Sequence, residues 1–336
     1  MTAPLLVTMG DAVGIGPEII VKAFLAGQLG DALVLGDAAV LRRAGAPMTA
    51  VVDHPADLAA VPPGCLAVLA VPGLSPGLAK LPWGRVDALC GAAAARCIEA
   101  AVAWLQAGQG AAIVTAPIHK QALAAAGVPY PGHTEMLQAL ARAPAVRMML
   151  ANEELRVVLV TIHQSLRSAI DAVSFDAVLH TLRITHAAAA SWQPGPARIG
   201  VAGLNPHAGE GGLFGTEERD IIAPAIAAAR AEGIDATGPF APDTVFMRAR
   251  RCEFDVVVAM THDHGLIPVK YLGVEQGVNV TLGLPFVRTS PDHGTAFDIA
   301  GTGLADPASL MAALRMARRL VADTTGGRAI QGASGP

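Results

Sequence analysis

The chain has 336 residues and a formal net charge of -4, with 15% charged and 52% hydrophobic residues. Average globular chains carry roughly 25% charged residues. Disorder requires low hydrophobicity and high net charge, so this composition excludes it. The four cysteines are scattered, which excludes a disulfide scaffold, and the acidic balance excludes a basic nucleic-acid surface. A chain of this length predicts one large domain or two closely linked domains.

A positive mean hydropathy of +0.46 raises the question of a membrane protein. A spanning helix needs about 20 consecutive apolar residues. The uncharged stretch 58–79 is interrupted by four prolines, and the stretch 100–118 contains Gln106, Gln109 and two glycines. The N-terminus has no basic segment followed by a long apolar core, so we expect no signal peptide. We therefore expect a soluble, cytoplasmic protein that does not bind a membrane.

Short apolar runs alternate along the chain with longer Ala-rich segments. We predict eight strands, at Leu5–Thr8, Ala32–Leu35, Leu66–Val71, Ala111–Thr115, Val157–Thr161, Ile199–Gly203, Val256–Met260 and Val278–Leu282. We predict helices at Asp87–Gln106, Phe175–Ser191, Thr216–Ala231 and Asp306–Ala322, the third with Glu217 and Glu218 as acids of its first turn. Unbroken apolar runs are typical of strands buried on both faces. The alternation predicts an α/β fold with helices on both sides of the sheet.

Polar and Gly-rich clusters follow five of the predicted strands. They lie at 9–18, at 116–120 with 132–135, at His163, at 205–212 and at 262–265. Ligands bind outside the carboxyl ends of strands in open α/β sheets, so these clusters predict a ligand site. The dinucleotide pattern G-x-G-x-x-G, the P-loop and the G-x-S-x-G elbow are all absent. Gly14-Ile15-Gly16-Pro17 instead fits a tight turn into a helix, with proline in the first turn.

Three histidines, His163, His207 and His262, are candidates for a divalent metal site, because imidazole nitrogen binds such ions well. Three protein ligands would leave positions open for substrate oxygens. The alternative is that each histidine is hydrogen-bonded in the core or a loop. Lys270 and Arg288 beside Gly-rich loops indicate an anion site for carboxylate or phosphate, with a pair of surface charges as the alternative.

Five stretches, taken in order, resemble a known family. They are Gly14–Glu18, Pro131–Glu135, Gly203–Gly212 with Thr216-Glu217-Glu218, Gly277–Phe286, and Arg288-Thr289-Ser290 with Asp292–Ala296. The family is the 4-hydroxythreonine-4-phosphate dehydrogenases of vitamin B6 biosynthesis and their close paralogues. The resemblance covers nearly the whole chain.

The resemblance implies an isocitrate/isopropylmalate dehydrogenase-like fold with two α/β/α subdomains and a cleft between them. We expect one subdomain to comprise residues 1–130 with 285–336, and the second, dimerising subdomain to comprise about 131–284. The family implies a homodimer whose site is shared between subunits. It also implies NAD, with NADP as the alternative, and a divalent metal such as Zn, Mg, Co, Mn or Ni.

The resemblance also assigns roles to residues of this chain. His163, His207 and His262 match the metal ligands; His133, Thr134, Lys270, Asn279 and Arg288 match substrate-binding positions; Gly294, Thr295 and Asp298 lie in the cofactor loop; and Asp243, Asp263 and Lys120 are the candidates for proton transfer. The implied reaction is metal- and NAD-dependent oxidation of a hydroxyl of a small anionic substrate, a 4-phosphorylated hydroxy acid, followed by decarboxylation.

The chain departs from the family pattern at several positions. It has Thr261-His262-Asp263-His264-Gly265 where the family usually has Tyr-His-Asp-Gln-Gly, and Ala12-Val13 where Pro-Ala is frequent. The stretch 161–167 favours the paralogues that oxidise D-threonate or D-erythronate 4-phosphate. Two further hypotheses are a dehydrogenase of a terephthalate-derived cis-dihydrodiol and a catalytically silent metabolite-binding protein with the same fold.

Overall fold

The computed structural model of the chain describes residues 3–190, 192 and 195–331. The chain divides into two compact units, which we call unit 1 and unit 2. Unit 1 comprises Met1–Pro144 and Leu284–Val321, and unit 2 comprises Ala145–Gly283 and the residues from Ala322 onward. We expected the first boundary at residue 130. The structure assigns α5 (His133–Ala141) to unit 1, because Met136 and Leu137 of this helix are buried in the core of that unit.

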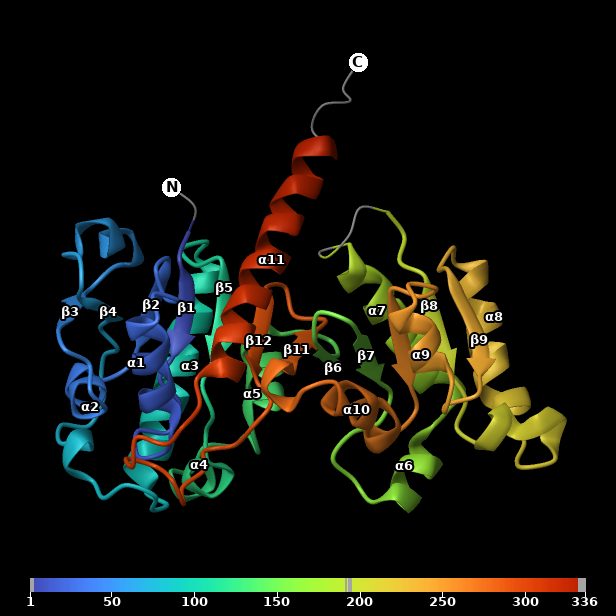
Figure 1. Cartoon of the computed structure of the whole chain (residues 1–336), viewed down its shortest axis with the longest axis horizontal. Helices are drawn as coiled ribbons and strands as arrows, with labels where there is room; N and C mark the ends of the chain where they lie inside the picture. The colour runs from blue at the N-terminus through green and yellow to red at the C-terminus, as the bar shows by residue number, and fades with distance from the viewer. Residues whose placement is uncertain (1–2, 191, 193–194, 332–336) are drawn as a thin grey trace. The chain divides into compact units, whose positions relative to one another are not determined.

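Unit 1 contains a parallel set of six strands. Their order is β3 (Thr49–Val52), β4 (Leu66–Leu69), β2 (Ala32–Leu35), β1 (Leu5–Thr8), β5 (Ala112–Thr115) and β12 (Val287–Pro291). In Figure 1 the orange strand β12, from the C-terminal part of the chain, lies beside the N-terminal strands. Four of these strands, β1, β2, β4 and β5, are buried along their whole length, as expected for parallel strands covered on both faces.

Helices cover both faces of this set. On one face α3 (Ala88–Gln106) and α5 pack against Leu6, Leu33 and Ile113. On the other face Thr289 of β12 donates a hydrogen bond to the carbonyl of Ala313 in α11 (Ala308–Gln331). The remaining helices are α1 (Gly16–Leu25), α2 (Ala38–Arg43) and α4 (Lys120–Ala125), with 3₁₀ turns at Pro55–Ala60 and Leu78–Lys80.

Unit 2 contains the other six strands. Their order is β11 (Val278–Leu282), β6 (Arg147–Ala151), β7 (Arg156–Leu159), β10 (Val256–Ala259), β8 (Ile199–Ala202) and β9 (Ala236–Phe240). Strand β6 pairs antiparallel with β11 and β7, whereas β7, β10, β8 and β9 pair in parallel. The carboxyl ends of the four parallel strands therefore lie at one edge, which is where the polar loops begin.

Helices also cover both faces of the unit 2 strands. Helices α9 (Val245–Arg250) and α10 (His262–Tyr271) pack on the face that presents Leu150, Val157 and Val257. On the opposite face Arg147 of β6 donates to Thr181 of α7 (Phe175–Ala189), which packs against α8 (Ala223–Ala231). Shorter elements are α6 (Leu166–Ala172), a 3₁₀ segment at Pro206–Gly212, a π-helical turn at Glu218–Ile222 and a 3₁₀ turn at Val274–Gln276.

The predicted α/β class with helices on both sides is confirmed, and all eight predicted strands are present, three with the predicted ends and five with ends shifted by one or two residues. Four further strands, β3, β6, β9 and β12, were not predicted. Strands β9, which contains Gly-Pro, and β12, which reads Val-Arg-Thr-Ser-Pro, lack an unbroken apolar run. Strands β3 and β6 have only short apolar runs, each after a polar first residue, Thr49 and Arg147. Ser191, the expected end of α7, lies outside the described residues.

One described helix, α3, is long and apolar enough to cross a membrane by length and composition. Its apolar side, which includes Cys97, Ile98 and Val102, is buried in the core of unit 1, while Arg96 and Glu99 are exposed. A buried core helix meets the same criteria, and this packing is that of a core helix.

Candidate functional site

Two of the predicted metal ligands lie together in unit 2. His163 follows β7, and His262 is the first residue of α10 after β10, so the pairing of β7 with β10 brings the two loops side by side. Their ring centroids are 5.6 Å apart. Two nitrogens on one tetrahedral ion lie roughly 3.4 Å apart, given metal–nitrogen bonds of about 2.1 Å. The spacing of the two rings fits such a pair.

Asp263 orients the imidazole of His262. Nδ1 of His262 lies 2.7 Å from Oδ1 of Asp263. With the proton on Nδ1, the imidazole donates to this carboxylate and keeps the Nε2 lone pair for a ligand. Metal-binding histidines commonly use a carboxylate in this way. Asp263 was one of three candidates for proton transfer, and its contact in this chain is with His262, a predicted metal ligand.

The third predicted ligand, His207, lies in a neighbouring cavity. Among the described residues, no three His, Cys, Asp or Glu side chains are grouped closely enough to hold one ion. The donor chemistry of the set, with three imidazoles and one orienting carboxylate, fits a divalent cation. The single chain supplies the pair His163–His262, and His207 remains a predicted third ligand.

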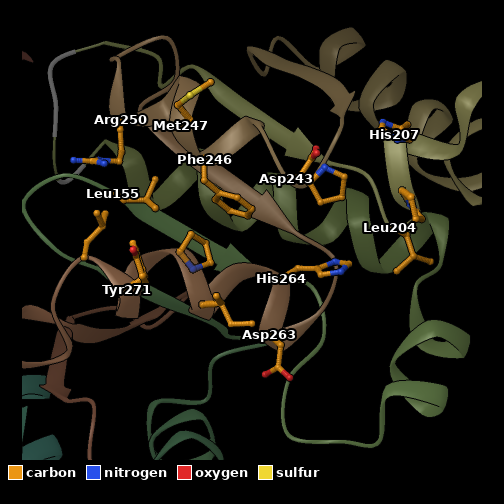
Figure 2. A pocket seen from close by; sticks show the side chains of 15 residues that line it. Leu155, Leu204, His207, Asp243, Phe246, Met247, Arg250, Asp263, His264 and Tyr271 are labelled. Carbon is orange, nitrogen blue, oxygen red and sulfur yellow. The ribbon is translucent and has the colours of Figure 1, made fainter.

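The larger cavity of unit 2 has a volume of about 660 Å³. Its polar lining residues are His207, Asp243, Arg250, Asp263 and His264, and its apolar lining comes mainly from α9 and α10, including Phe246, Met247, Ile267 and Tyr271. Figure 2 shows Phe246 among these side chains, with the carboxylate of Asp263 pointing away from them at the edge. A largely apolar cavity with a few polar groups is typical of a site for a small molecule or a second protein chain.

A second cavity of about 540 Å³ adjoins the histidine pair. It is lined by the 161–166 segment, Ala169 and residues 261–264. Asp263 and His264 line both cavities. His264 was assigned no role from the sequence, yet its Nδ1 is buried and has no hydrogen-bond partner among the described residues. Its position two residues after a predicted ligand was the one available signal.

The loop that carries His207 has an unusual backbone. Residues 207–211 all have positive φ angles, including 52° at His207, 51° at Ala208 and 43° at Glu210. His163 also has a positive φ of 30°. Non-glycine residues in this region cost roughly 1–3 kcal/mol each and cluster at functional sites. Two of the three predicted metal ligands are thus held in strained conformations.

A buried carboxylate organises this loop. Oε1 of Glu218 accepts hydrogen bonds from the backbone nitrogens of Leu204 and Asn205, both at 2.7 Å, and Oε2 accepts one from Nδ2 of Asn205 at 2.9 Å. Burial acts to raise the pKa of Glu218, but these hydrogen bonds outweigh it and hold the pKa below its ordinary value. We expected Glu218 to be an acid of a helical first turn; it begins a π-helical turn instead, and its side chain fixes the 204–205 backbone.

The predicted anion-binding residue Arg288 lies in unit 1 and is 3% exposed. Its Nε and Nη2 both donate to Oγ1 of Thr115, at 3.2 and 2.7 Å. Burial lowers the pKa of Arg288 to about 10, so the guanidinium stays charged at neutral pH. The alternative of a surface charge is therefore wrong for Arg288.

His133 lies close enough to Arg288 for their charges to interact. Burial, with a smaller contribution from the positive Arg288, holds the pKa of His133 well below its ordinary value. The imidazole is therefore neutral at pH 7, and its buried Nε2 has no hydrogen-bond partner among the described residues. Thr134 follows it in α5 and is half-buried. The exposed Lys120 lies near Gly132, the residue before α5: a Cβ built on Gly132 would be 3.8 Å from Cε of Lys120.

The expected cofactor loop is attached to the turn after β1. The carbonyl of Thr295 accepts a hydrogen bond from the backbone nitrogen of Ile15 at 3.0 Å. Phe297 stacks on His119, with ring centroids 4.5 Å apart and planes at 15°. Gly294 and Asp298 of this loop are exposed, whereas Thr295 is buried. The loop thus presents exposed groups on a fixed backbone.

Two predicted substrate-binding residues do not line the cavities described above. Lys270 is in the last turn of α10, and Asn279 is in β11, opposite Leu150 of β6. Neither residue lines either cavity of unit 2. Their assignment remains a prediction from the resemblance.

Comparisons with known proteins identify relatives of full length. The family model for "Pyridoxal phosphate biosynthetic protein PdxA" matches residues 28–317. A 4-hydroxythreonine-4-phosphate dehydrogenase from Beijerinckia indica subsp. indica is 56% identical over 327 residues, covering 96% of both chains. A D-threonate 4-phosphate dehydrogenase from Pectobacterium atrosepticum is 44% identical over 328 residues, covering 95% of this chain and 100% of the relative.

A solved structure gives the same result for the fold. The crystal structure of 4-hydroxythreonine-4-phosphate dehydrogenase from Klebsiella pneumoniae has a TM-score of 0.88 and 44% identity, covering 96% of this chain and 98% of that one. The resemblance inferred from the ordered motifs is therefore confirmed over nearly the whole length, and the chain belongs to the PdxA family of pyridoxal phosphate biosynthetic proteins.

Proposed function

We propose that this chain is an NAD-dependent dehydrogenase that oxidises a hydroxyl of a 4-phosphorylated hydroxy acid of the 4-phosphooxy-threonine type, and that the product then loses carbon dioxide. The observation that carries the proposal is the full-length identity of 56% to a 4-hydroxythreonine-4-phosphate dehydrogenase. NADP is the alternative cofactor. The paired imidazoles and the buried guanidinium agree with this chemistry.

His163 and His262 would hold a divalent cation, with Asp263 orienting His262. When bound, the cation would polarise the substrate oxygen and the nicotinamide would take the hydride. The chain itself contributes oriented ligands, since Asp263 holds the ring of His262 and His163 has a left-handed backbone. Zn, Mg, Co, Mn and Ni are all compatible with such a donor set.

The third ligand would be His207 of the partner subunit in a homodimer. Two facts support this arrangement: the single chain groups no three ligands among its described residues, and His207 lines a large apolar cavity. A partner surface covering that cavity would also bury the exposed side chains of Ile267 and Tyr271, which are 64% and 90% exposed. We expect the enzyme to act in the cytoplasm.

The phosphate of the substrate would bind Arg288, His133 and Thr134 of unit 1. Lys270 and Asn279 of unit 2 are the further substrate-binding positions that the resemblance implies. A buried, charged guanidinium beside a neutral imidazole suits an oxyanion, because both can donate hydrogen bonds to it. Gly294, Thr295 and Asp298 would contact the cofactor. Proton transfer would fall to Asp243, Asp263 or Lys120, of which Asp243 lines the larger cavity beside His207.

Two alternative substrates follow from specific observations. The 44% identity to a D-threonate 4-phosphate dehydrogenase keeps D-threonate or D-erythronate 4-phosphate as the runner-up. A non-phosphorylated cis-dihydrodiol with a ring carboxylate is the third candidate, since a guanidinium such as that of Arg288 suits carboxylate as well as phosphate. A silent binding protein would need neither His163 nor His262 beside an open cavity.

The test is NADH formation by the purified protein with each candidate acid, together with carbon dioxide release, before and after treatment with a chelator. Metal-dependent turnover of a 4-phosphorylated acid is expected. Turnover of the diol alone would replace the substrate assignment, and turnover unaffected by metal removal would reject the metal mechanism. No turnover with any acid would favour the silent binder.

A further inference from the structure

The hydroxyl of Thr115 holds one edge of the Arg288 guanidinium. Its Nε and Nη2 donate to Oγ1 of Thr115, and both residues are almost fully buried, at 3% and 1% exposed. The Nε–Nη2 edge is one with which arginine commonly forms a bidentate pair with a carboxylate. In this chain that edge is engaged by the strand next to β12.

The strand pairing explains why this contact is rigid. Arg288 of β12 is opposite Ile113 of β5, so its side chain lies on the same face of the sheet as those of Ile113 and Thr115. Thr115 is the last residue of β5, directly before the 116–120 loop. The threonine χ1 angle is restricted by its branched Cβ, so the hydroxyl offers a fixed point for the guanidinium plane.

We propose that Thr115 is a positioning residue for anion binding: its hydroxyl sets the orientation of the Arg288 guanidinium, and thereby the affinity for the phosphate group of the substrate. Thr115 need not touch the anion. Without these two hydrogen bonds the Nε–Nη2 edge of the guanidinium would no longer be fixed, so the plane would turn and the donors that face the oxyanion would lose their direction. Bidentate groups depend on such preorganisation more than point charges do.

A neighbouring residue supplies a matched control. Thr8 of β1 is opposite Thr115 in the register and is equally buried, at 1% exposed. Its Oγ1 has no hydrogen-bond partner among the described residues. Thr8→Val and Thr115→Val therefore remove the same group from adjacent positions on the same face, but only the second removes an acceptor from Arg288.

The experiment measures binding of inorganic phosphate by calorimetry, and KM and kcat with the best phosphorylated substrate, in the full-length protein. Thr115→Val is expected to weaken phosphate binding and raise KM by roughly tenfold to a hundredfold, with kcat changed far less. Thr115→Ser, which keeps the hydroxyl, is expected to restore both values. Thr8→Val is expected to match the wild type, and in an Arg288→Met background Thr115→Val is expected to have no further effect.

Unchanged phosphate affinity in Thr115→Val, or an equal loss in Thr8→Val, would overturn the proposal, as would a wild type that binds no phosphate. Thr115→Ala takes the place of Thr115→Val if the valine variant does not fold. The kinetic part rests on the proposed function, whereas the calorimetric part does not. A wild type that turns over no phosphorylated acid but shows this pattern of phosphate binding would reject the function and retain the role of Thr115.

Discussion

The rings of His163 and His262 lie 5.6 Å apart, although one histidine follows β7 and the other begins α10. The parallel pairing of β7 with β10 brings the ends of these strands together. Asp263 then holds one ring by its Nδ1, and a left-handed backbone sets the direction of the other. This pair is the centre of the proposed metal site.

The left-handed backbone at His207 predicts that the stability of a variant depends on whether the new residue carries a Cβ. With φ at 52°, His207→Gly should be more stable than His207→Ala by about 1 kcal/mol, because only alanine carries the Cβ penalty. Both variants should lose metal binding. Urea unfolding measures the difference, and the reverse order is expected at the exposed helical position His180, where glycine is the poorer residue. Equal stability of the two His207 variants would show that the loop relaxes.

Glu218→Gln should destabilise unit 2 by about 1–3 kcal/mol, because an amide replaces a charged acceptor of three hydrogen bonds. The folded pKa of Glu218 lies below its unfolded value near 4.5, so its contribution is complete above that pH and is lost as pH falls through the folded pKa. Unfolding free energies of wild type and variant should therefore converge in acid. A difference that persists unchanged at low pH would contradict the charge-based explanation.

His133 should make the stability of unit 1 depend on pH in a higher range. Its folded pKa is well below the ordinary 6.5, so the unfolded chain binds a proton below that pH while the folded chain does not. The contribution of His133 to the unfolding free energy is therefore fully present above pH 6.5 and declines as the pH falls below it. His133→Gln should flatten this part of the pH profile of thermal unfolding. A profile identical to the wild type would place the titrating group elsewhere.

Gly14→Ala should weaken cofactor binding. A Cβ at Gly14 would stand 3.1 Å from Cβ and 3.2 Å from the carbonyl oxygen of Thr295, so the loop would have to move by a few tenths of an ångström. A titration with NADH, followed by its fluorescence, measures the dissociation constant directly. Gly30→Ala is the control, because a Cβ there meets nothing within 4 Å. Equal NADH affinity in both variants would separate this loop from the cofactor site.

The sequence predicted the parts of the fold that depend on apolar patterning. Unbroken runs such as Ile199–Ala202 identify buried parallel strands, and polar clusters after strands predict where His163 and His262 meet. Strand β12 escaped prediction because its polar residues, including Arg288, are buried by partners distant in sequence. Only the folded structure shows that Arg288 donates to Thr115.

The local conformation of the His207 loop could not be predicted either. Three of its five consecutive residues with positive φ are not glycines. Glu218 holds the loop in place, but in the sequence it stands in a segment that reads as an ordinary helix start. Backbone propensities describe how a residue type behaves on average, whereas functional sites often hold residues in conformations that their type disfavours. His264 was likewise visible in the sequence, but its place between two cavities was not.

The most direct test of the proposed metal site is a cobalt titration of the metal-free protein, followed by visible absorption of the bound ion. We predict saturable binding with imidazole-type spectra in the wild type and in His180→Ala, whose histidine is exposed on α7, and loss of both signal and dehydrogenase activity in His163→Ala and His262→Ala. Cobalt binding and activity that survive in His163→Ala and His262→Ala would contradict the assignment of this pair as metal ligands.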